Sequence, residues 1–284
     1  MHDIRRAVLD DNNGERMVPE TSGGYTFWEH VFRYAFACRF VKQKRVLDIA
    51  CGEGYGAASL QMAGAHSVVG IDLCETACIH ARRRYGVDAR TGTADRIPLP
   101  DGSVDIVVSF ETIEHVTHPT RFLDECSRVL GPQGMLVIST PNKGIYTKGG
   151  GWQNPHHCSE MTQEEFSSAL SARFDETRLF TQRPDTAAFW SMRSLVCNSS
   201  PWNRIRGFQR FRCGLQAVVA REAIRNPTED QRKNVCSLIL AVERGAHPLS
   251  PFAVRPLREW TREKPIYIIA VATRIGSRRS QSGS

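Results

Sequence analysis

The sequence predicts an α/β protein with a doubly wound, mostly parallel sheet of seven strands. Two patterns carry this prediction. From Arg45 to about Thr140, short runs rich in Val and Ile, bounded by Gly, Asp or Pro, alternate with stretches of helical periodicity. Two further strand-like runs follow later in the chain. The expected strands cover residues 45–50, 67–72, 86–91, 104–110, 134–140, 175–182 and 265–273.

Helical segments connect most of these strands. Residues 55–64, 74–85 and 118–130 carry the helical periodicity. Strands that alternate with helices in this way lie parallel and are joined by right-handed crossovers. Open sheets of this kind bind ligands in the crevice outside the carboxyl ends of their strands, so we look for functional residues there.

Several segments lie outside this alternation. An apolar helix is expected over residues 25–41, and the capping-box pair Thr162 and Glu165 begins another before the sixth strand. About 80 residues, 184–264, then break the pattern; they hold a further helix that opens at Thr228. The chain returns to strand character at 265–273. We therefore expect residues 184–264 to be an insertion before the last strand of one sheet.

The composition is typical of a soluble globular protein. The 284 residues are 41% hydrophobic and 24% charged, and no run approaches the ~18 consecutive apolar residues of a membrane span. The N-terminus lacks the apolar core and cleavage site of a secretory signal. Nine scattered cysteines without a CxxC pair are typical of a reduced protein, so we expect a cytoplasmic location.

The net charge of +7 does not indicate a specific binding partner. Basic residues are spread along the chain, and part of the excess lies in a polar C-terminal tail that we expect to be disordered. A broad positive balance attracts nucleic acid but does not recognise it. We therefore expect a small-molecule acceptor as the partner and not nucleic acid, with the oligomeric state left open.

The stretch "RVLDIACGEGYGA" (45–57) indicates a nucleotide-like ligand. Gly52 and Gly54 let the backbone turn sharply between a strand and a helix whose N–H groups point toward a ligand. Asp72 closes the next strand 20 residues after Gly52, where a carboxylate can accept hydrogen bonds from ribose hydroxyls. An adenosine-type ligand is the prediction. A nicotinamide dinucleotide stays an alternative, because "GEGYGA" also fits its fingerprint.

The residues downstream distinguish between these ligands. "GTADRIPLPDGSVDIVVSFETIEHV" (91–116) places Ala94 and Asp95 after the third strand and "FETIEHV" after the fourth. The whole series, about residues 45 to 142, resembles the class I S-adenosylmethionine-dependent methyltransferases, a Rossmann-like family. The resemblance implies S-adenosyl-L-methionine as cofactor and S-adenosyl-L-homocysteine as product. Carried over to matching positions, the implied cofactor-binding residues are Ala50, Gly52, Glu53, Gly54, Asp72, Leu73, Ala94, Asp95 and Glu111. Ala50 stands where many members have a first glycine.

A narrower likeness suggests the acceptor. "GERMVPE" (14–20), "ACGEGYG" (50–56) and "NPHHCSEMTQEEF" (154–166) are similar to bacterial methyltransferases of sugars and natural products, and more loosely to quinone-ring O-methyltransferases. The likeness implies an N-terminal lid that holds Arg16, Pro19 and Phe27. We therefore divide the chain into a lid and helix (1–44), a cofactor-binding core (45–183), a substrate cap insertion (184–264), the last core strand (265–274) and the tail (275–284). Phe189, Trp190, Met192 and Trp202 are expected to line the acceptor pocket or to form the core of the cap.

Histidines are the candidate catalytic residues. Removing a proton from an acceptor hydroxyl assists methyl transfer, and a neutral imidazole is a suitable base near neutral pH. His157 matches the position that recurs in related proteins, and Glu160 three residues later can orient it. His156 is the neighbouring candidate. His115 in "IEHV" is a third, with a role beside the cofactor as the alternative.

Other possibilities stay open. Glu111, Glu114, His115 and His118 make a divalent-metal constellation that we do not favour, and Cys74 and Cys78 have no second pair to complete a zinc site. The acceptor atom is open between oxygen and nitrogen. An RNA methyltransferase would use a basic and aromatic surface, made of Trp202, Arg204, Arg206, Phe208, Arg210, Phe211 and Arg212. A non-catalytic cofactor-binding protein is the remaining alternative.

Overall fold

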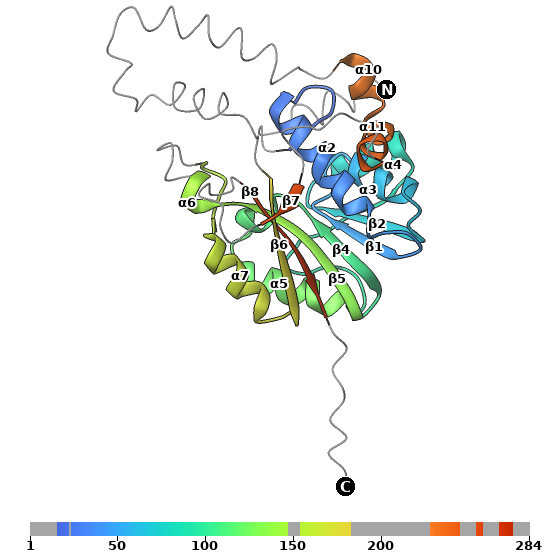
Figure 1. Cartoon of the computed structure of the whole chain (residues 1–284). Helices are drawn as coiled ribbons and strands as arrows, with labels where there is room; N and C mark the ends of the chain where they lie inside the picture. Colours follow the sequence, from blue (N-terminus) through green and yellow to red (C-terminus); the bar gives the residue numbers. More distant parts are fainter. Residues whose placement is uncertain are drawn as a thin grey trace, which may run out of the picture.

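Eight strands form one sheet in the order β3-β2-β1-β4-β5-β8-β6-β7 (Figure 1). The structure is a computed structural model that describes residues 16–22, 24–146, 154–182, 228–244, 254–257 and 267–274. The strands are β1 (Arg45–Ile49), β2 (Ser67–Asp72), β3 (Asp88–Thr91), β4 (Val104–Ser109), β5 (Leu130–Pro141), β6 (Glu176–Gln182), β7 (Val254–Pro256) and β8 (Tyr267–Thr273). All seven expected strands are present, and the three-residue β7 pairs with β6 at the sheet edge.

The order of the strands places a crevice at the centre of the sheet. β1 to β5 are parallel, whereas β8 runs antiparallel to both β5 and β6. From β1 the chain moves outward through β2 and β3, then returns to β4 on the other side of β1. A sheet whose order reverses in this way opens a crevice at the carboxyl ends of the two central strands. The mostly parallel, Rossmann-like α/β fold that the sequence predicts is confirmed.

Helices cover both faces of the sheet (Figure 1). One face packs against α2 (Gly24–Cys38), α3 (Tyr55–Met62), α4 (Glu75–Tyr85) and α11 (Val235–Glu243). The other packs against α5 (Pro119–Val129) and α7 (Gln163–Ser171). The short elements are the 3-10 helix η1 (Ile113–His115), α6 (Lys143–Tyr146) and α10 (Glu229–Lys233).

Strand β4 shows why the sequences of the parallel strands are continuous runs of apolar residues. Ile106 and Val108 point into the core under α2 and α3, while Val107 points into the core under α5. Successive side chains of a strand alternate between its faces, and here both faces are covered. The central strands therefore have no solvent face, and the polar residues of the site lie at their ends.

Local signals set the helix ends. The capping box predicted at Thr162 is formed and begins α7, and the helix expected to open at Thr228 begins there as α10, with a capping box between Thr228 and Gln231. Helix α3 ends at Met62, slightly before the predicted residue 64, because Gly64 takes a left-handed φ of +94° that closes the helix. The elements η1, α6 and β7 were not expected from the sequence, and the one helix expected from Thr228 through Val242 is divided at Asn234 into α10 and α11.

The described pieces of the region 184–264 pack on the core. Helix α11 lies against α2 and α3, and its buried residues Val235, Ile239, Leu240 and Val242 belong to the same apolar cluster as those helices. The expected cap aromatics, the basic and aromatic surface 202–212 and the tail 275–284 lie outside the described residues. Within the described ranges, no helix is long and apolar enough to cross a membrane.

Candidate functional site

A pocket of about 480 Å³ opens at the carboxyl ends of β1, β2, β3 and β4. Its volume lies within the range of about 300–1,000 Å³ that is usual for small-molecule sites. The lining residues are Ile49, Ala50, Ile71, Asp72, Leu73, Gly92, Thr93, Ala94, Asp95, Thr112, His115, Val116, Thr117 and His118. The pocket therefore lies at the crevice that the strand order creates.

The structure brings together most of the residues carried over for the cofactor. Seven residues singled out from the sequence line the pocket: Ala50, Asp72, Leu73, Ala94, Asp95, His115 and His118. Gly52, Glu53, Gly54 and Glu111 are not among its lining residues and lie in the adjoining loops after β1 and β4. Leu73 is 75% exposed and, with Met62, is one of two exposed large apolar residues in the described part of the chain.

Backbone hydrogen bonds hold the Asp72 carboxylate in place. Oδ2 accepts from the Gly52 N–H at 2.7 Å, and Oδ1 accepts from the Cys74 N–H at 2.9 Å. These bonds join the end of β2 to the glycine loop that follows β1. A carboxylate oxygen can accept more than one hydrogen bond, so Asp72 keeps acceptor capacity toward the pocket it lines.

The glycine loop depends on a left-handed backbone. Gly52 and Gly54 have φ values of +52° and +85°, and Ala50 takes a φ of +59° in spite of its side chain. A Cβ on Gly54 would lie 2.4 Å from the Cβ of Ala81 on α4. Gly54 is thus required both for its conformation and for the close approach of α4 to the loop. Non-glycine residues in this region are strained and are frequent at functional sites.

Glu53 faces partners within the protein. Its side chain is 1% exposed; Oε2 lies 2.6 Å from His80 Nδ1, and Oε1 accepts from Arg16 Nη1 at 3.3 Å. A Cβ on Gly52 would come within 3.3 Å of the Arg16 side chain. Arg16 therefore lies directly against the glycine loop. Of the other two residues expected in the lid, Pro19 is buried and Phe27 is fully buried in the core.

A buried carboxyl lies beneath the loop. Asp48, the last polar residue of β1, is 1% exposed, and the Tyr34 hydroxyl donates to its Oδ1 at 3.2 Å. Burial raises the pKa of Asp48 to about 8, although the hydrogen bond from Tyr34 works in the opposite direction. Tyr34 had no assigned role in the sequence analysis, because nothing in an aromatic helix distinguishes it from its packing neighbours.

Glu111 is held by a buried arginine. Its backbone has a φ of +51°, its Oε1 lies 2.8 Å from Arg33 Nη1, and the Ser139 hydroxyl donates to the same oxygen at 2.7 Å. The Arg33 guanidinium lies 4.7 Å from the centre of the Tyr267 ring. Arg33 is 1% exposed, which is rare for this residue type. Its signal in the sequence was an arginine between apolar residues of the helix expected at 25–41, which also contains Arg39.

The three candidate histidines differ in their surroundings. The His157 side chain is 6% exposed, its Nδ1 lies 2.6 Å from Glu160 Oε1, and its ring packs against those of His115 and Tyr146. His156 is exposed, and its carbonyl oxygen lies 3.1 Å from His115 Nδ1. Of the adjacent pair, His157 is thus the one whose ring faces its neighbours in the site.

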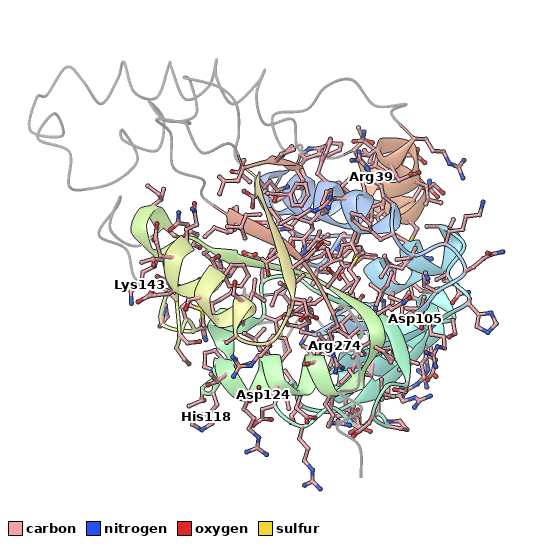
Figure 2. All side chains as sticks on the ribbon, turned by 60° about the horizontal axis from the view of Figure 1, so that its bottom comes forward. Arg39, Asp105, His118, Asp124, Lys143 and Arg274 are labelled. Carbon is pink, nitrogen blue, oxygen red and sulfur yellow. The ribbon has the colours of Figure 1, made fainter. Side chains whose placement is uncertain are left out.

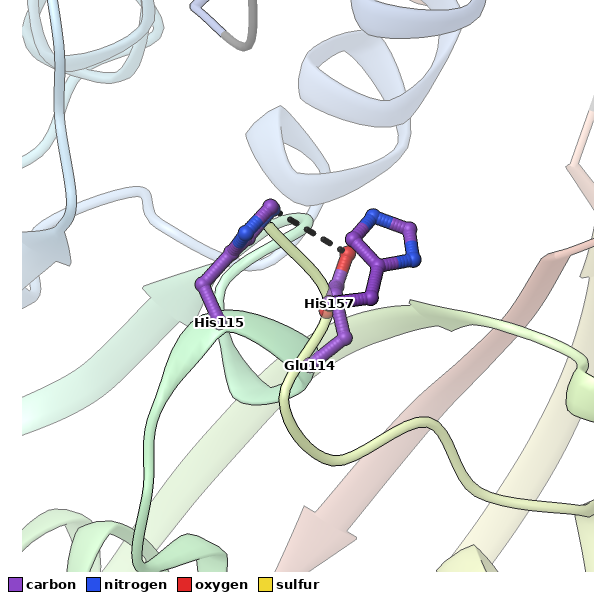
Figure 3. A group of neighbouring side chains, drawn as sticks. All are labelled: Glu114, His115 and His157. Atoms are coloured by element: carbon purple, nitrogen blue, oxygen red, sulfur yellow. Dashed lines mark ion pairs between the residues drawn. The ribbon is translucent and has the colours of Figure 1, made fainter. Parts of the chain in front are cut away.

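Glu114, His115 and His157 point toward one another (Figure 3). Glu114 is fully buried, and burial, with Glu111 next in effect, holds the pKa of its carboxyl well above the usual range. Of the metal constellation considered from sequence, Glu114 and His115 belong to this cluster, with His157 as the third member. Glu111 is not a member. His118, an exposed residue just before α5 (Figure 2), lines the pocket but is not a member of the cluster either.

Comparison with known proteins identifies the central domain. Residues 47–138 match the family model described as a methyltransferase domain. A probable S-adenosylmethionine-dependent methyltransferase of Mycobacterium tuberculosis is 39% identical over 160 residues, which are 55% of this chain and 58% of that protein. A ubiquinone biosynthesis O-methyltransferase of Maricaulis maris is 36% identical over 105 residues, 35% of this chain and 41% of that protein. The matched region thus spans less than two thirds of each relative.

A solved structure shows the same fold over nearly the whole chain. A possible histamine N-methyltransferase of Thermotoga maritima has a TM-score of 0.57 at 16% identity, and the match covers 96% of this chain and 100% of that one. At this identity the likeness concerns the fold. Residues 47–138 are thus similar to a methyltransferase domain, and the residues that line the pocket at the ends of β1 to β4 all lie within this range.

Proposed function

We propose that the protein transfers a methyl group from S-adenosylmethionine to a hydroxyl of a small molecule, a sugar or a natural-product intermediate. The observation that carries the proposal is the pocket at the crevice. One cavity gathers Ala50, Asp72, Leu73, Ala94 and Asp95, the positions that the resemblance assigns to the cofactor. The O-methyltransferase relative supports oxygen as the acceptor atom.

The residues present fit this cofactor. In our proposal the Asp72 carboxylate accepts hydrogen bonds from the two ribose hydroxyls, with its position fixed by the Gly52 and Cys74 N–H groups. Ala94 and Asp95 contact the adenine, and the exposed Leu73 side chain covers it. The loop made of Ala50, Gly52, Glu53 and Gly54, together with Glu111, holds the methionine part. The left-handed conformations of this loop bring its backbone close to a ligand.

Methyl transfer from a sulfonium requires the protein mainly to position the acceptor and to exclude water. When bound, the cofactor supplies a methyl group on a sulfonium; the C–S bond breaks with its electron pair going to sulfur, and the acceptor oxygen bonds to the carbon. The protein aligns the oxygen at about 3–3.5 Å from the methyl group and excludes water. Burial of the residues around Glu111 and Arg33 supports this exclusion.

His157 is the proposed base. Its Nδ1 is held by Glu160 at 2.6 Å, which leaves Nε2 to receive the proton of the acceptor hydroxyl. The His157 ring lies 4.9 Å from that of His115, centre to centre, and His115 lines the pocket. The base therefore borders the proposed cofactor site. His115 is the residue between the two, and His156 contributes its carbonyl group to hold it.

The N-terminal lid and the cap complete the proposal. Arg16 pairs with Glu53 and lies against Gly52, which supports a role for residues 1–44 in covering the loop. We assign the acceptor side of the site to residues 184–264, because segments that follow the sheet strands vary with substrate.

Calorimetric titration tests the cofactor assignment. S-adenosylhomocysteine is expected to bind at micromolar concentration and NAD is not. Asp72→Ala should weaken binding about 100-fold, since a hydrogen bond to a charged group contributes about 1.5–3 kcal/mol. Asp88→Ala is the matched control, because Asp88 pairs with Arg90 on the surface of β3. Binding of NAD, or equal affinity in both variants, would contradict the assignment.

Methyl transfer is then measured with a panel of sugar, phenolic and amine acceptors. Turnover of hydroxyl acceptors alone supports the proposal. Turnover of the amines alone would replace it with N-methylation, and cofactor binding without any turnover would favour a non-catalytic role.

A further inference from the structure

We propose that Glu114, His115 and His157 form a binding site for a divalent cation that accepts nitrogen ligands, such as Zn²⁺ or Co²⁺. Each residue offers one ligand atom, and the three atoms all lie within 4.8 Å of one another. The side chains come from two separate segments, η1 and the loop before α7, yet they converge on one point (Figure 3).

Both histidines are oriented as metal ligands are. His115 Nδ1 lies 3.1 Å from the carbonyl oxygen of His156, and His157 Nδ1 lies 2.6 Å from Glu160 Oε1. A ring nitrogen beside an oxygen acceptor carries the proton, so in each ring the electron pair that can bind a cation is on Nε2. Metal-binding histidines usually donate their other N–H to a carbonyl or carboxylate in this way. Both rings therefore have the tautomer that a cation needs.

Glu114 contributes a buried oxygen that lacks a hydrogen bond. Its Oε2 accepts from the Thr140 hydroxyl at 3.3 Å, whereas Oε1 is buried without a hydrogen-bond donor among the described residues. His115 Nε2 lies 3.9 Å from Oε1. A buried acceptor without a partner is costly. A cation between these atoms would satisfy Oε1 and use both Nε2 electron pairs.

The ligand set indicates the class of cation. Two imidazoles and one carboxylate suit Zn²⁺ and its first-row neighbours, whereas Mg²⁺ and Ca²⁺ prefer oxygen ligands. Three protein ligands also leave coordination positions open, as in catalytic metal sites. Since His115 lines the pocket, the open positions border it.

The use of the cation in catalysis rests on the proposed function. With a cation bound, His157 would be one of its ligands and not the base; the acceptor hydroxyl would bind the cation and pass its proton to solvent. A metal-bound hydroxyl releases its proton more readily than a free one. Binding of the cation itself does not depend on methyl transfer and can be measured separately.

Cobalt titration tests the site. The full-length protein is treated with a chelator and titrated with Co²⁺, with binding followed by calorimetry and by visible absorption. One Co²⁺ per chain is expected. His157→Ala and Glu114→Gln should each weaken binding by about 100-fold or more, and Glu160→Gln by about 10-fold, because it only orients His157. His66→Ala should bind like the unaltered protein, since His66 is exposed and lies between α3 and β2.

The outcomes separate this inference from the proposed function. Equal Co²⁺ affinity in His157→Ala and the unaltered protein, no binding at all, or a thiolate charge-transfer band from cysteine ligands would overturn the site. S-adenosylhomocysteine titration of the same variants shows that they are folded. If the unaltered protein does not bind S-adenosylhomocysteine, the proposed function is contradicted, but the conclusion from the cobalt titration is unaffected.

Discussion

The two halves of the candidate site are built in different ways. The half that we propose for the cofactor, called the cofactor half below, consists of residues at or shortly after the ends of β1, β2 and β3: Ala50, Asp72, Leu73, Ala94 and Asp95. The histidine half joins η1 to a loop about 40 residues further along, where Glu114 and His115 meet His157. The first half needs only that the strands be parallel. The second requires two loops to dock on each other.

Hydrogen bonds to backbone carbonyl groups join the loop before α7 to η1. The Cys158 and Ser159 N–H groups donate to the Glu114 carbonyl oxygen at 2.8 and 3.0 Å. The Ser159 hydroxyl lies 2.8 Å from the carbonyl oxygen of Ile113 and 2.9 Å from that of Val116. The two halves are therefore held by different contacts, and in our proposal substitutions can affect acceptor chemistry and leave cofactor affinity intact.

The largest expected effect is on the histidine half. His157→Ala should lower kcat for a hydroxyl acceptor by about 100- to 10,000-fold, the range for loss of a general base. Its affinity for S-adenosylhomocysteine should stay unchanged, because His157 is not a lining residue of the pocket. His156→Ala, which keeps the carbonyl group that holds His115, is the comparison. Steady-state kinetics with calorimetry measures both values; a parallel fall in cofactor affinity would break the separation of the halves.

A substitution beneath the cofactor half should act on stability. Gly54→Ala should lower the free energy of unfolding by about 3 kcal/mol, because its Cβ would clash with Ala81 and its φ is left-handed. Gly86→Ala is the matched control: Gly86 also has a positive φ, but nothing lies within 4 Å of the added Cβ, so about 1 kcal/mol is expected. Urea unfolding measures the difference, and equal losses would show that α4 can move away from the loop.

Asp48 makes the stability of the cofactor half depend on pH. Its pKa of about 8 in the folded chain exceeds the unfolded value of about 3.9, so the folded chain binds more protons between these values. Its contribution to stability is present below about pH 4 and is lost as the pH rises toward 8. As the pH rises from about 4 to 8, the free energy of unfolding of Asp48→Asn should therefore increase relative to that of the unaltered protein by up to roughly 1.4 kcal/mol per pH unit.

Thermal unfolding at a series of pH values follows this gain. Asp105→Asn is the control of opposite sign, since the hydrogen bond from Arg45 lowers the pKa of Asp105. That carboxylate stabilises the fold above its unfolded pKa and loses its effect only as the pH falls below about 4. A difference between Asp48→Asn and the unaltered protein that stays constant from pH 4 to 8 would disprove the raised pKa.

The smallest expected effect concerns the exposed leucine of the cofactor half. Leu73→Ala should weaken S-adenosylhomocysteine binding by about 5-fold, equivalent to about 1 kcal/mol of lost apolar cover, and should leave the melting temperature unchanged. Met62→Ala tests specificity, because Met62 is 53% exposed and lies outside the pocket. Calorimetry distinguishes the two variants. A loss with Met62→Ala as well would place the effect on overall folding and not on the pocket.

The sequence by itself determined the fold class and most of the cofactor half. Strands with two covered faces are continuous apolar runs, and a residue that follows a parallel strand must lie at its carboxyl edge, so Asp72 and Ala94 could be placed from their positions alone. Gly54 likewise indicated a turn that other residues cannot make. The capping pairs at Thr162 and Thr228 were readable because their contacts are local.

Only the tertiary structure decided the remaining contacts. The pairs Arg33 with Glu111, Arg16 with Glu53 and Tyr34 with Asp48 join different elements, and no spacing rule relates them. The choice between His156 and His157 depends on which ring turns inward, and membership of His157 with Glu114 and His115 depends on how two loops dock. Local patterns report a residue's own strand or helix, whereas a partner distant in the sequence is chosen by packing.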